Sequence, residues 1–378
     1  MGKIGVYFLI FLLFILGGFC FWKNFGGLWF ANSPAKENLV QLIENGTNIT
    51  GIPKPGENQT QFPLKVPESY SISVYVKDLG KARDLTLDPN GVVVASLMDK
   101  GQVVAVPGGN IRIIAEGLGN PHGLAFNGDK LFVAETDQVA VYDYDAVNFK
   151  ASNKKKIIDL PPGGRHFTRS LVIRDGRLFV SIGSTCDTCV EKDNRYASIW
   201  TANLDGSGFK SYATGLRNSV FMALNPETNE IWATEMGRDF LGDDLPPEEV
   251  NIIREGGNYG WPYCYGDKVP DPQTNSGGTK FNCANTVTPH IAFQAHSAPL
   301  GLAFLENDLL VSYHGSWNRS TPTGYKVVRF RNGTEEDFLT GWQDDGLALG
   351  RPVDILVKGR EIYISDDKAG VIYLLKAI

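Results

Sequence analysis

The sequence has little of the positive charge that a nucleic-acid-binding protein needs. Its 378 residues include 36 lysines and arginines against 42 aspartates and glutamates, a net charge of -6 at pH 7. A phosphate-binding protein needs basic residues clustered on one face, and the run Lys154 to Lys156 is too short for that. This argues against a nucleic-acid partner, and we interpret the triplet as part of a solvated loop.

Stretches of helical period are also scarce from about Ser71 onward. Short alternating or apolar runs follow one another instead, bounded by Gly, Asn, Asp and Pro, which is typical of β-strands. With 43% hydrophobic residues, a chain of this length can fill a sizeable core. We therefore predict an ordered all-β domain over residues 67–378.

Cysteine is rare as well. Apart from Cys20, the chain has the CxxC pair Cys186 and Cys189, then Cys264 and Cys283. In an extracytoplasmic domain an even number predicts two disulfides, most simply within each pair, because each would close one local loop. A four-cysteine zinc site is the alternative, although it would usually contain a second closely spaced pair.

One apolar run is long. Residues Ile4 to Trp22 are almost free of charge, and at ~1.5 Å per residue a helix of this length just spans a bilayer core of ~30 Å. Residues 1–23 are therefore predicted to be a transmembrane or signal helix. Large Phe19 precedes Cys20 where a lipoprotein cleavage site needs a small residue, and no small-residue signal-peptidase site follows. An uncleaved anchor is favoured over a cleaved signal.

Residues 24–66 are rich in Pro, Gly and Asn, which predicts a linker that holds the domain off the membrane. Several triplets fit the N-glycosylation pattern: they begin at Asn45, Asn48, Asn58, Asn318 and Asn332. Three of them crowd into the linker. Together with the cysteines, they predict a location on the extracytoplasmic face of the cell membrane, or secretion if the first segment is cleaved.

Six segments share one pattern, an apolar pair, an Asx or Gly turn and an apolar run. They are LTLDPNGVVVAS, LAFNGDKLFVAE, LVIRDGRLFVSI, MALNPETNEIWATE, LAFLENDLLVSY and ILVKGREIYISD. Their spacing of roughly 40 to 60 residues suits the inner hairpins of propeller blades. A β-sandwich would give similar strands but not six matched repeats, so we predict a six-bladed β-propeller whose loops converge on a shared pocket.

The segment from Glu235 to Pro262 combines carboxylates with turn residues and a Gly-Trp-Pro corner. Ca²⁺ takes six to eight oxygen ligands, and the carboxylates offered here are Glu235, Asp239, Asp243, Asp244, Glu248 and Glu249. A site loop is predicted, with a solvated acidic loop as the alternative.

The motif E-x-N-x-I-x-x-G-x-N-Y-G-W-P, which starts at Glu249, resembles the hallmark of the glucose/sorbosone dehydrogenase family. These are pyrroloquinoline-quinone (PQQ) enzymes on a six-bladed propeller. Further matches spread from Asn120 to Gly370, and the chain is more similar to the sorbosone dehydrogenase branch.

The resemblance implies PQQ and Ca²⁺ as cofactors. PQQ carries three carboxylates, which Arg can hold with two parallel hydrogen bonds. The implied cofactor-binding residues are Arg217 and Asn218 in TGLRNSVF, Arg319 in HGSWNRS, Arg351 in GRPVD, Arg169, and Asn120 or His122 in the second blade. The carbonyl oxygens of Gly237 and Arg238 would hold the calcium ion.

His166 lies in RHFTRSLVIRDG, at the entry to a predicted inner hairpin. An unperturbed His titrates near neutrality and suits general-base catalysis, although a hydrogen-bonding loop residue is the alternative. The family places its catalytic base at the equivalent position. The resemblance therefore implies that His166 takes the proton from the C1 hydroxyl of a sugar while hydride passes to PQQ.

The expected function is thus an aldose or sorbosone dehydrogenase with a small sugar as substrate and an external electron acceptor. Val220 and Phe221 stand where relatives often carry Gly, which affects the substrate assignment more than the cofactor one. Two alternatives remain open: an extracellular propeller that binds a partner without cofactor, and a calcium-dependent propeller lactonase.

Overall fold

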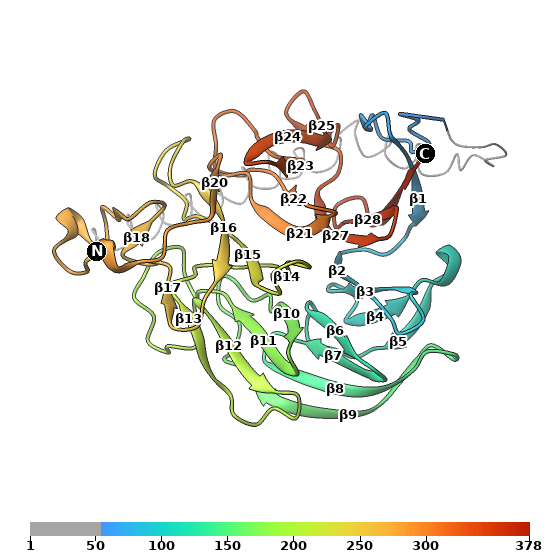
Figure 1. The fold of residues 1–378 in the computed structure, drawn as a ribbon, viewed down its shortest axis with the longest axis horizontal. Helices are drawn as coiled ribbons and strands as arrows, with labels where there is room; N and C mark the ends of the chain where they lie inside the picture. The colour runs from blue at the N-terminus through green and yellow to red at the C-terminus, as the bar shows by residue number, and fades with distance from the viewer. Residues whose placement is uncertain (1–53) are drawn as a thin grey trace, which may run out of the picture. The chain divides into compact units, whose positions relative to one another are not determined.

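The structure is a computed structural model that describes residues 54–378. The predicted membrane or signal helix and the linker up to residue 53 lie outside the described residues. Among residues 54–378, no helix has the length and apolar character that a membrane crossing requires. The described part is one compact unit, built of antiparallel sheets that surround a central axis (Figure 1).

Each blade is one sheet of four strands, with a fifth short strand in the third blade. The first blade in chain order contains β2 (Ala82–Leu87), β3 (Val93–Leu97), β4 (Gln102–Ala105) and β5 (Arg112–Ala115). The second contains β6 (Leu124–Asn127), β7 (Lys130–Ala134), β8 (Gln138–Asp145) and β9 (Lys150–Asp159). The third contains β10 (Leu171–Arg174), β11 (Arg177–Ile182), β12 (Ser198–Asn203), β13 (Lys210–Thr214) and the parallel β17 (Gly257–Asn258).

The remaining blades complete the ring. The fourth contains β14 (Met222–Leu224), β15 (Ile231–Glu235), β16 (Glu248–Ile253) and β20 (Ile291–Phe293). The fifth contains β21 (Pro299–Leu305), β22 (Asp308–Tyr313), β23 (Lys326–Arg331) and β24 (Thr334–Leu339). The sixth contains β27 (Pro352–Lys358), β28 (Glu361–Asp366), β29 (Val371–Ala377) and β1 (Tyr70–Val76). Two small ribbons lie outside the blades: β18 (Cys264–Tyr265) with β19 (Val269–Pro270), and β25 (Gln343–Asp344) with β26 (Leu347–Ala348).

The prediction of an all-β, six-bladed propeller is confirmed. Each of the six repeats forms the inner hairpin of one blade: β2–β3, β6–β7, β10–β11, β14–β15, β21–β22 and β27–β28. Strands such as β3 and β11 are buried along almost their whole length, because neighbouring blades cover both faces. This is why the second half of each repeat is a continuous apolar run rather than an alternating one.

The ring is closed by pairing between the two ends of the propeller. β1 lies antiparallel to β29, with Tyr70 opposite Ala377 and Val74 opposite Tyr373. Ile72 and Tyr373 are fully buried at this seam. Because the last blade borrows its outer strand from the start of the domain, neither end can leave without opening the ring.

The described part of the predicted linker packs onto this closing blade and onto the end of the fifth blade. Asn58 bridges to Ile72, and Lys65 bridges to Thr340. The side-chain nitrogen of Asn58 donates to the carbonyl oxygens of Phe62 and Leu64. An N-linked glycan on Asn58 would replace one of those two hydrogens.

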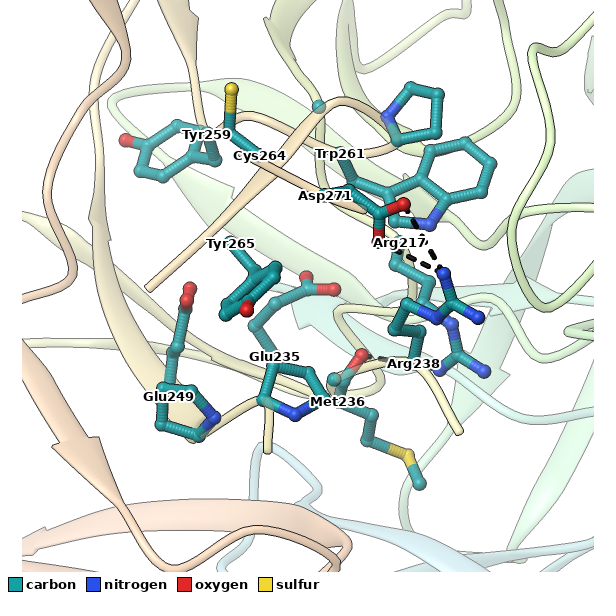
Figure 2. A pocket seen from close by; sticks show the side chains of 15 residues that line it. Arg217, Glu235, Met236, Arg238, Glu249, Tyr259, Trp261, Cys264, Tyr265 and Asp271 are labelled. Atoms are coloured by element: carbon teal, nitrogen blue, oxygen red, sulfur yellow. Dashed lines mark hydrogen bonds and ion pairs between the residues drawn. The ribbon is translucent and has the colours of Figure 1, made fainter. Parts of the chain in front are cut away.

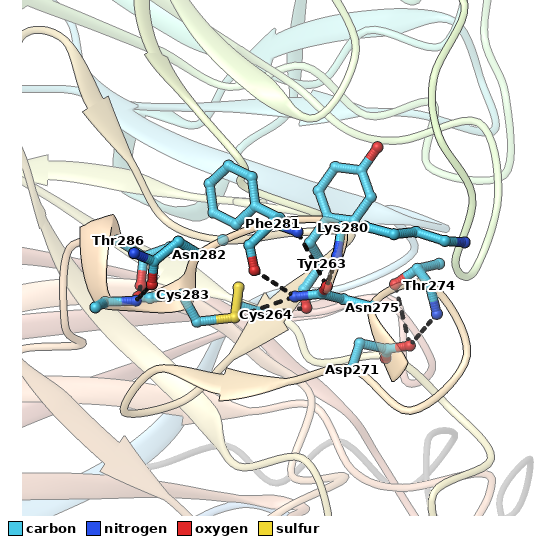
Figure 3. Close-up of a disulfide and its surroundings, with 12 residues drawn as sticks. Tyr263, Cys264, Asp271, Thr274, Asn275, Lys280, Phe281, Asn282, Cys283 and Thr286 are labelled. Carbon is cyan, nitrogen blue, oxygen red and sulfur yellow. Dashed lines mark hydrogen bonds between the residues drawn. A yellow bond between two sulfur atoms is a disulfide. The ribbon is translucent and has the colours of Figure 1, made fainter. Parts of the chain in front are cut away.

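Both predicted disulfides are present, Cys186 with Cys189 and Cys264 with Cys283, so the zinc alternative is excluded. Figure 3 shows Cys264 and Cys283 at the two ends of a loop outside the fourth blade. In that loop, Asn275 accepts backbone hydrogen bonds at 2.9 and 3.0 Å from residues 280 and 281. The disulfide and this side chain together fix an otherwise irregular segment.

Candidate functional site

The candidate site is formed by loops that precede inner strands or join the second and third strands of a blade. His166 lies just before β10, and Arg217 lies just before β14. The β11–β12 loop (183–197) contacts both residues, and the β15–β16 loop (236–247) contacts Arg217. The third and fourth blades thus bring together residues far apart in the sequence.

His166 is held from two directions. Its Nδ1 lies 2.8 Å from Oγ of Ser184, and its backbone N–H donates to the carbonyl of the same residue at 3.1 Å. Burial, followed by the positive charges of Arg217 and Arg165, lowers the pKa of His166 to about 3. The imidazole is therefore uncharged at neutral pH and has a lone pair with which to accept a proton.

Arg217 is buried and fully engaged. Its Nε and Nη2 donate to the carbonyl and the carboxylate of Asp187, at 2.9 and 2.6 Å. Its Nη1 donates to the carbonyl of Met236 at 3.2 Å. The guanidinium therefore ties the β11–β12 loop to the β15–β16 loop, and Figure 2 shows it beside Met236 and Arg238.

Two further charged residues, Asp239 and Arg165, lie next to the Arg217–Asp187 ion pair. Asp239 donates its backbone N–H to the Asp187 carboxylate at 3.0 Å, and its own carboxylate accepts from Arg165 at 3.0 Å. Burial raises the pKa of Asp239 against the opposing effect of Arg217. Nε and Nη1 of Arg165 have no hydrogen bond within residues 54–378, and its side chain is 41% exposed, so it can still donate to an anionic ligand.

Asn218 contacts the same group of loops. Its backbone N–H donates to Glu235 at 2.7 Å, and its side-chain nitrogen lies 3.3 Å from the sulfur of Met236. Gly183 separates Asn218 from His166: a Cβ on this glycine would lie 2.5 Å from Cβ of His166 and 2.9 Å from Oδ1 of Asn218. Only glycine lets the two side chains approach this closely.

The predicted calcium-binding carbonyls lie on the neighbouring loop. The backbone N–H of Gly237 donates to Glu248 at 2.6 Å, which fixes the peptide between Met236 and Gly237. Within residues 54–378, the carbonyl oxygens of Gly237 and Arg238 accept no hydrogen bond. Two consecutive carbonyl oxygens without a protein donor fit a hard cation. The side chain of Arg238 turns away to pair with Asp271 at 2.9 Å.

A cavity of about 30 Å³ lies behind this loop (Figure 2). Glu235 and Glu249, which are opposite each other on β15 and β16, both line it. Burial raises the pKa of Glu235 to about 8 and that of Glu249 to about 7. These two carboxyls are part of the interior and are shielded from solvent.

The two remaining predicted arginines lie on later loops of the ring. Arg351 donates through Nε to the carbonyl of His314 at 2.9 Å and through Nη2 to that of Gly315. Its Nη1 has no partner within the described residues. Arg319 binds the carbonyl of Asp243 and lies 3.1 Å from the carboxylate of Asp244, so it braces the β15–β16 loop.

Three predicted residues have other surroundings. Asn120 is exposed on its loop. His122 and Arg169 are fully buried, and Nδ1 of His122 lies 3.2 Å from the carbonyl of Arg169. The guanidinium of Arg169 donates to three carbonyls of its own loop, those of Pro161, His166 and Thr168. In this structure Arg169 shapes the loop that carries His166; contact with a cofactor stays a prediction.

Sequence analysis missed several residues. Ser184, Asp187 and Arg165 gave no signal, because serines, aspartates and arginines are common in any loop. Arg83, which pairs with Asp367 at 2.7 Å, could have been found. It stands two residues before its apolar run, as His122 and Arg169 do before theirs, so the repeat itself marks it as an inner-ring residue.

Comparison with known proteins gives one family. The TrAA12-like family model matches residues 64–344. The chain is 28% identical to a pyrroloquinoline quinone-dependent sugar dehydrogenase of Hypocrea jecorina, over 61% of this chain and 66% of that protein. It is 30% identical to an uncharacterized protein of Borreliella burgdorferi, over 89% of this chain and 96% of that protein.

Two solved structures show the same fold. One is the holo form of the PQQ domain of pyranose dehydrogenase from Coprinopsis cinerea, with a TM-score of 0.73 and 22% identity over 86% of this chain and 98% of that chain. The other is a calcium structure of the Trichoderma reesei carbohydrate-active enzyme of family AA12, with a TM-score of 0.72 and 22% identity over 88% of this chain and 100% of that chain.

Proposed function

The chain belongs to the TrAA12-like family, which includes PQQ-dependent sugar dehydrogenases, and we propose that it is itself a PQQ- and calcium-dependent dehydrogenase that oxidises a sugar at C1. The observation that carries this proposal is the uncharged His166 beside Arg217, next to two free carbonyl oxygens. A protein that only binds a partner needs no proton acceptor among cations. The structure therefore supports an enzyme better than a cofactor-free binding module.

The donor set fits the two cofactors. The free carbonyl oxygens of Gly237 and Arg238 would hold Ca²⁺, and the unpaired guanidinium nitrogens of Arg165 and Arg351 would bind carboxylates of PQQ. When bound, PQQ would supply a quinone that accepts hydride, and calcium would supply a Lewis acid beside it. Asn218 lies close enough to His166, across Gly183, to contact the same ligand.

His166 would act as the general base on the sugar. Its lowered pKa keeps the ring uncharged across the neutral range, so a lone pair is available without prior deprotonation. Loss of the proton from the C1 hydroxyl makes that carbon a better hydride donor. Arg217 and Arg165 oppose a positive charge on the ring, which favours release of the proton after each turnover.

We also propose that the substrate is an aldose or a sugar aldehyde such as sorbosone, that an external acceptor removes the electrons, and that the protein acts outside the cytoplasm. The two disulfides support the location, since disulfides persist in oxidising compartments. Attachment through residues 1–23 follows from the apolar run alone. Protease protection of the intact membrane fraction would locate the propeller.

The test is reconstitution of the full-length protein with PQQ and Ca²⁺. Dye reduction is followed across a panel of aldoses, for the parent, His166→Gln and the control His290→Ala, an exposed histidine on the fourth blade. Reduction should require both additives and fall at least ~100-fold in His166→Gln, the usual contribution of a general base. The control should match the parent.

Failure to bind PQQ would refute the cofactor assignment and leave the binding module or the lactonase. Tight PQQ binding with equal activity in His166→Gln and parent would refute only the role of the base. Tight binding without turnover of any sugar would refute the aldose assignment while keeping the cofactor.

A further inference from the structure

Ser184 occupies a position in the site that none of the motifs above identified. It follows β11 directly after Gly183 and is fully buried. Its Oγ lies 2.8 Å from Nδ1 of His166 and 2.7 Å from the carbonyl oxygen of Cys186. One hydroxyl group therefore joins the imidazole to the backbone of the disulfide loop.

The direction of these two hydrogen bonds is fixed by chemistry. A serine hydroxyl has a single proton, and a carbonyl oxygen can only accept. The proton of Ser184 must therefore go to Cys186, and its oxygen must accept a proton from Nδ1 of His166. Nδ1 then carries the ring proton, and Nε2 carries the lone pair.

The acceptor at Cys186 is itself held firmly. The next residue, Asp187, receives two hydrogen bonds from Arg217 and one from the backbone of Asp239. The disulfide to Cys189 closes the loop within four residues. The carbonyl therefore cannot turn to release the hydroxyl of Ser184 without breaking contacts that also place Arg217.

We propose that Ser184 is a positioning residue that locks His166 in the tautomer protonated on Nδ1, with the carbonyl of Cys186 as the acceptor that enforces this direction. Nε2 is then the proton acceptor, and it has no hydrogen bond within residues 54–378. The tautomer follows from the contacts alone. Its value for catalysis rests on the proposed function, in which His166 is the base.

The primary test needs no cofactor. Full-length protein labelled with ¹⁵N in its histidine rings is studied by long-range ¹H–¹⁵N correlation at pH 7.5, and His166→Gln identifies the signal among the five histidines. The parent should show a protonated Nδ1 and an unprotonated Nε2. A proton on Nε2 in the parent would overturn the proposal outright.

Two variants test the role of the hydroxyl. Ser184→Ala should lose the fixed tautomer and show signals of both forms, whereas Ser184→Thr, which keeps a hydroxyl, should retain the parent pattern. An unchanged tautomer in Ser184→Ala would show that another contact holds the ring. If a variant does not fold, the measurement on the parent still decides.

Activity separates positioning from mere structure. In the reconstituted enzyme, Ser184→Ala should lower kcat by about 10-fold or more with little change in KM, because the ring would no longer be held with its lone pair on Nε2. Ser184→Thr should recover most of the lost activity. A large rise in KM at unchanged kcat would contradict a role through His166. If no PQQ binds, the proposed function fails while the tautomer result stands.

Discussion

Placing a methyl group at position 183 tests the geometry of the site directly. In Gly183→Ala, the new Cβ would lie 2.5 Å from Cβ of His166 and 2.9 Å from Oδ1 of Asn218. Carbon atoms in ordinary contact are about 3.5–4.0 Å apart, so the loop that carries His166 must move by about 1 Å. A displacement of that size at a catalytic group costs about 100-fold in rate.

The assay compares kcat/KM of the reconstituted parent with that of Gly183→Ala, beside Gly119→Ala as a control. Gly119 lies in the loop between the first and second blades, and a Cβ there would meet only the Glu135 carboxylate at 3.7 Å. Denaturant unfolding of both variants checks stability, where overpacking should cost Gly183→Ala about 1–3 kcal/mol. Activity of Gly183→Ala within about threefold of the parent, with unfolding intact, would refute the close approach of His166 and Asn218.

Three further predictions concern stability and cations. Replacing Cys264 and Cys283 by Ala should lower the free energy of unfolding by about 3 kcal/mol, and replacing Cys186 and Cys189 by Ala should lower it by about 2 kcal/mol. The first disulfide closes a loop of sequence separation 19 and the second a loop of separation 3, so the unfolded chain gains more entropy when the first is removed. Denaturant titration that gave the reverse order would contradict this prediction. The folded state keeps Glu235 protonated to about pH 8 and so binds more protons than the unfolded state above pH 4.5, which makes the parent lose stability as pH rises. The free energy of unfolding of Glu235→Gln should therefore rise relative to that of the parent by up to about 1.4 kcal/mol per pH unit between pH 5 and 8. A difference that stays constant with pH would refute the buried carboxyl. Chelation of divalent cations should abolish dye reduction and added Ca²⁺ should restore it, whereas activity that survives exhaustive chelation would contradict a role for calcium.

The fold could be predicted because each blade repeats one local pattern. The turn and the apolar run are contiguous in the sequence, so each hairpin is encoded within about a dozen residues, and six copies allow only a few architectures. The disulfides followed from the same locality. Ring closure by β1 and the packing of residues 54–66 depend on contacts between the first and the last segments of the propeller domain, which no local pattern contains.

The site was predicted less completely. His166 and Arg217 stood out because motif residues surround them, and the structure brings both against the β11–β12 loop. The partners that orient them, Ser184 and Asp187, are joined to them across 18 and 30 positions of sequence. Such pairs depend on the exact conformation of two loops, and their residue types are ordinary turn formers.

The acidic loop shows how composition can mislead about mechanism. Its carboxylates predicted a cation site, with a solvated loop as the alternative, yet Glu235, Asp239, Glu248 and Glu249 are all buried. Glu248 accepts from the backbone of Gly237 at 2.6 Å and from that of residue 298 at 3.3 Å, so it joins the fourth blade to the fifth.

A buried carboxylate that holds the N–H side of a peptide fixes its plane, and the carbonyl of the preceding residue with it. In this loop the carboxylates therefore act on the backbone, and the free carbonyl oxygens of Gly237 and Arg238 are what remains for a cation. That division explains why a calcium site can sit beside Arg217 and Arg165. Arg217 is already bound to the Asp187 carboxylate, whereas Arg165 binds Asp239 through Nη2 alone. Neutral carbonyls do not compete for the two remaining nitrogens of Arg165, which stay available to an anionic cofactor.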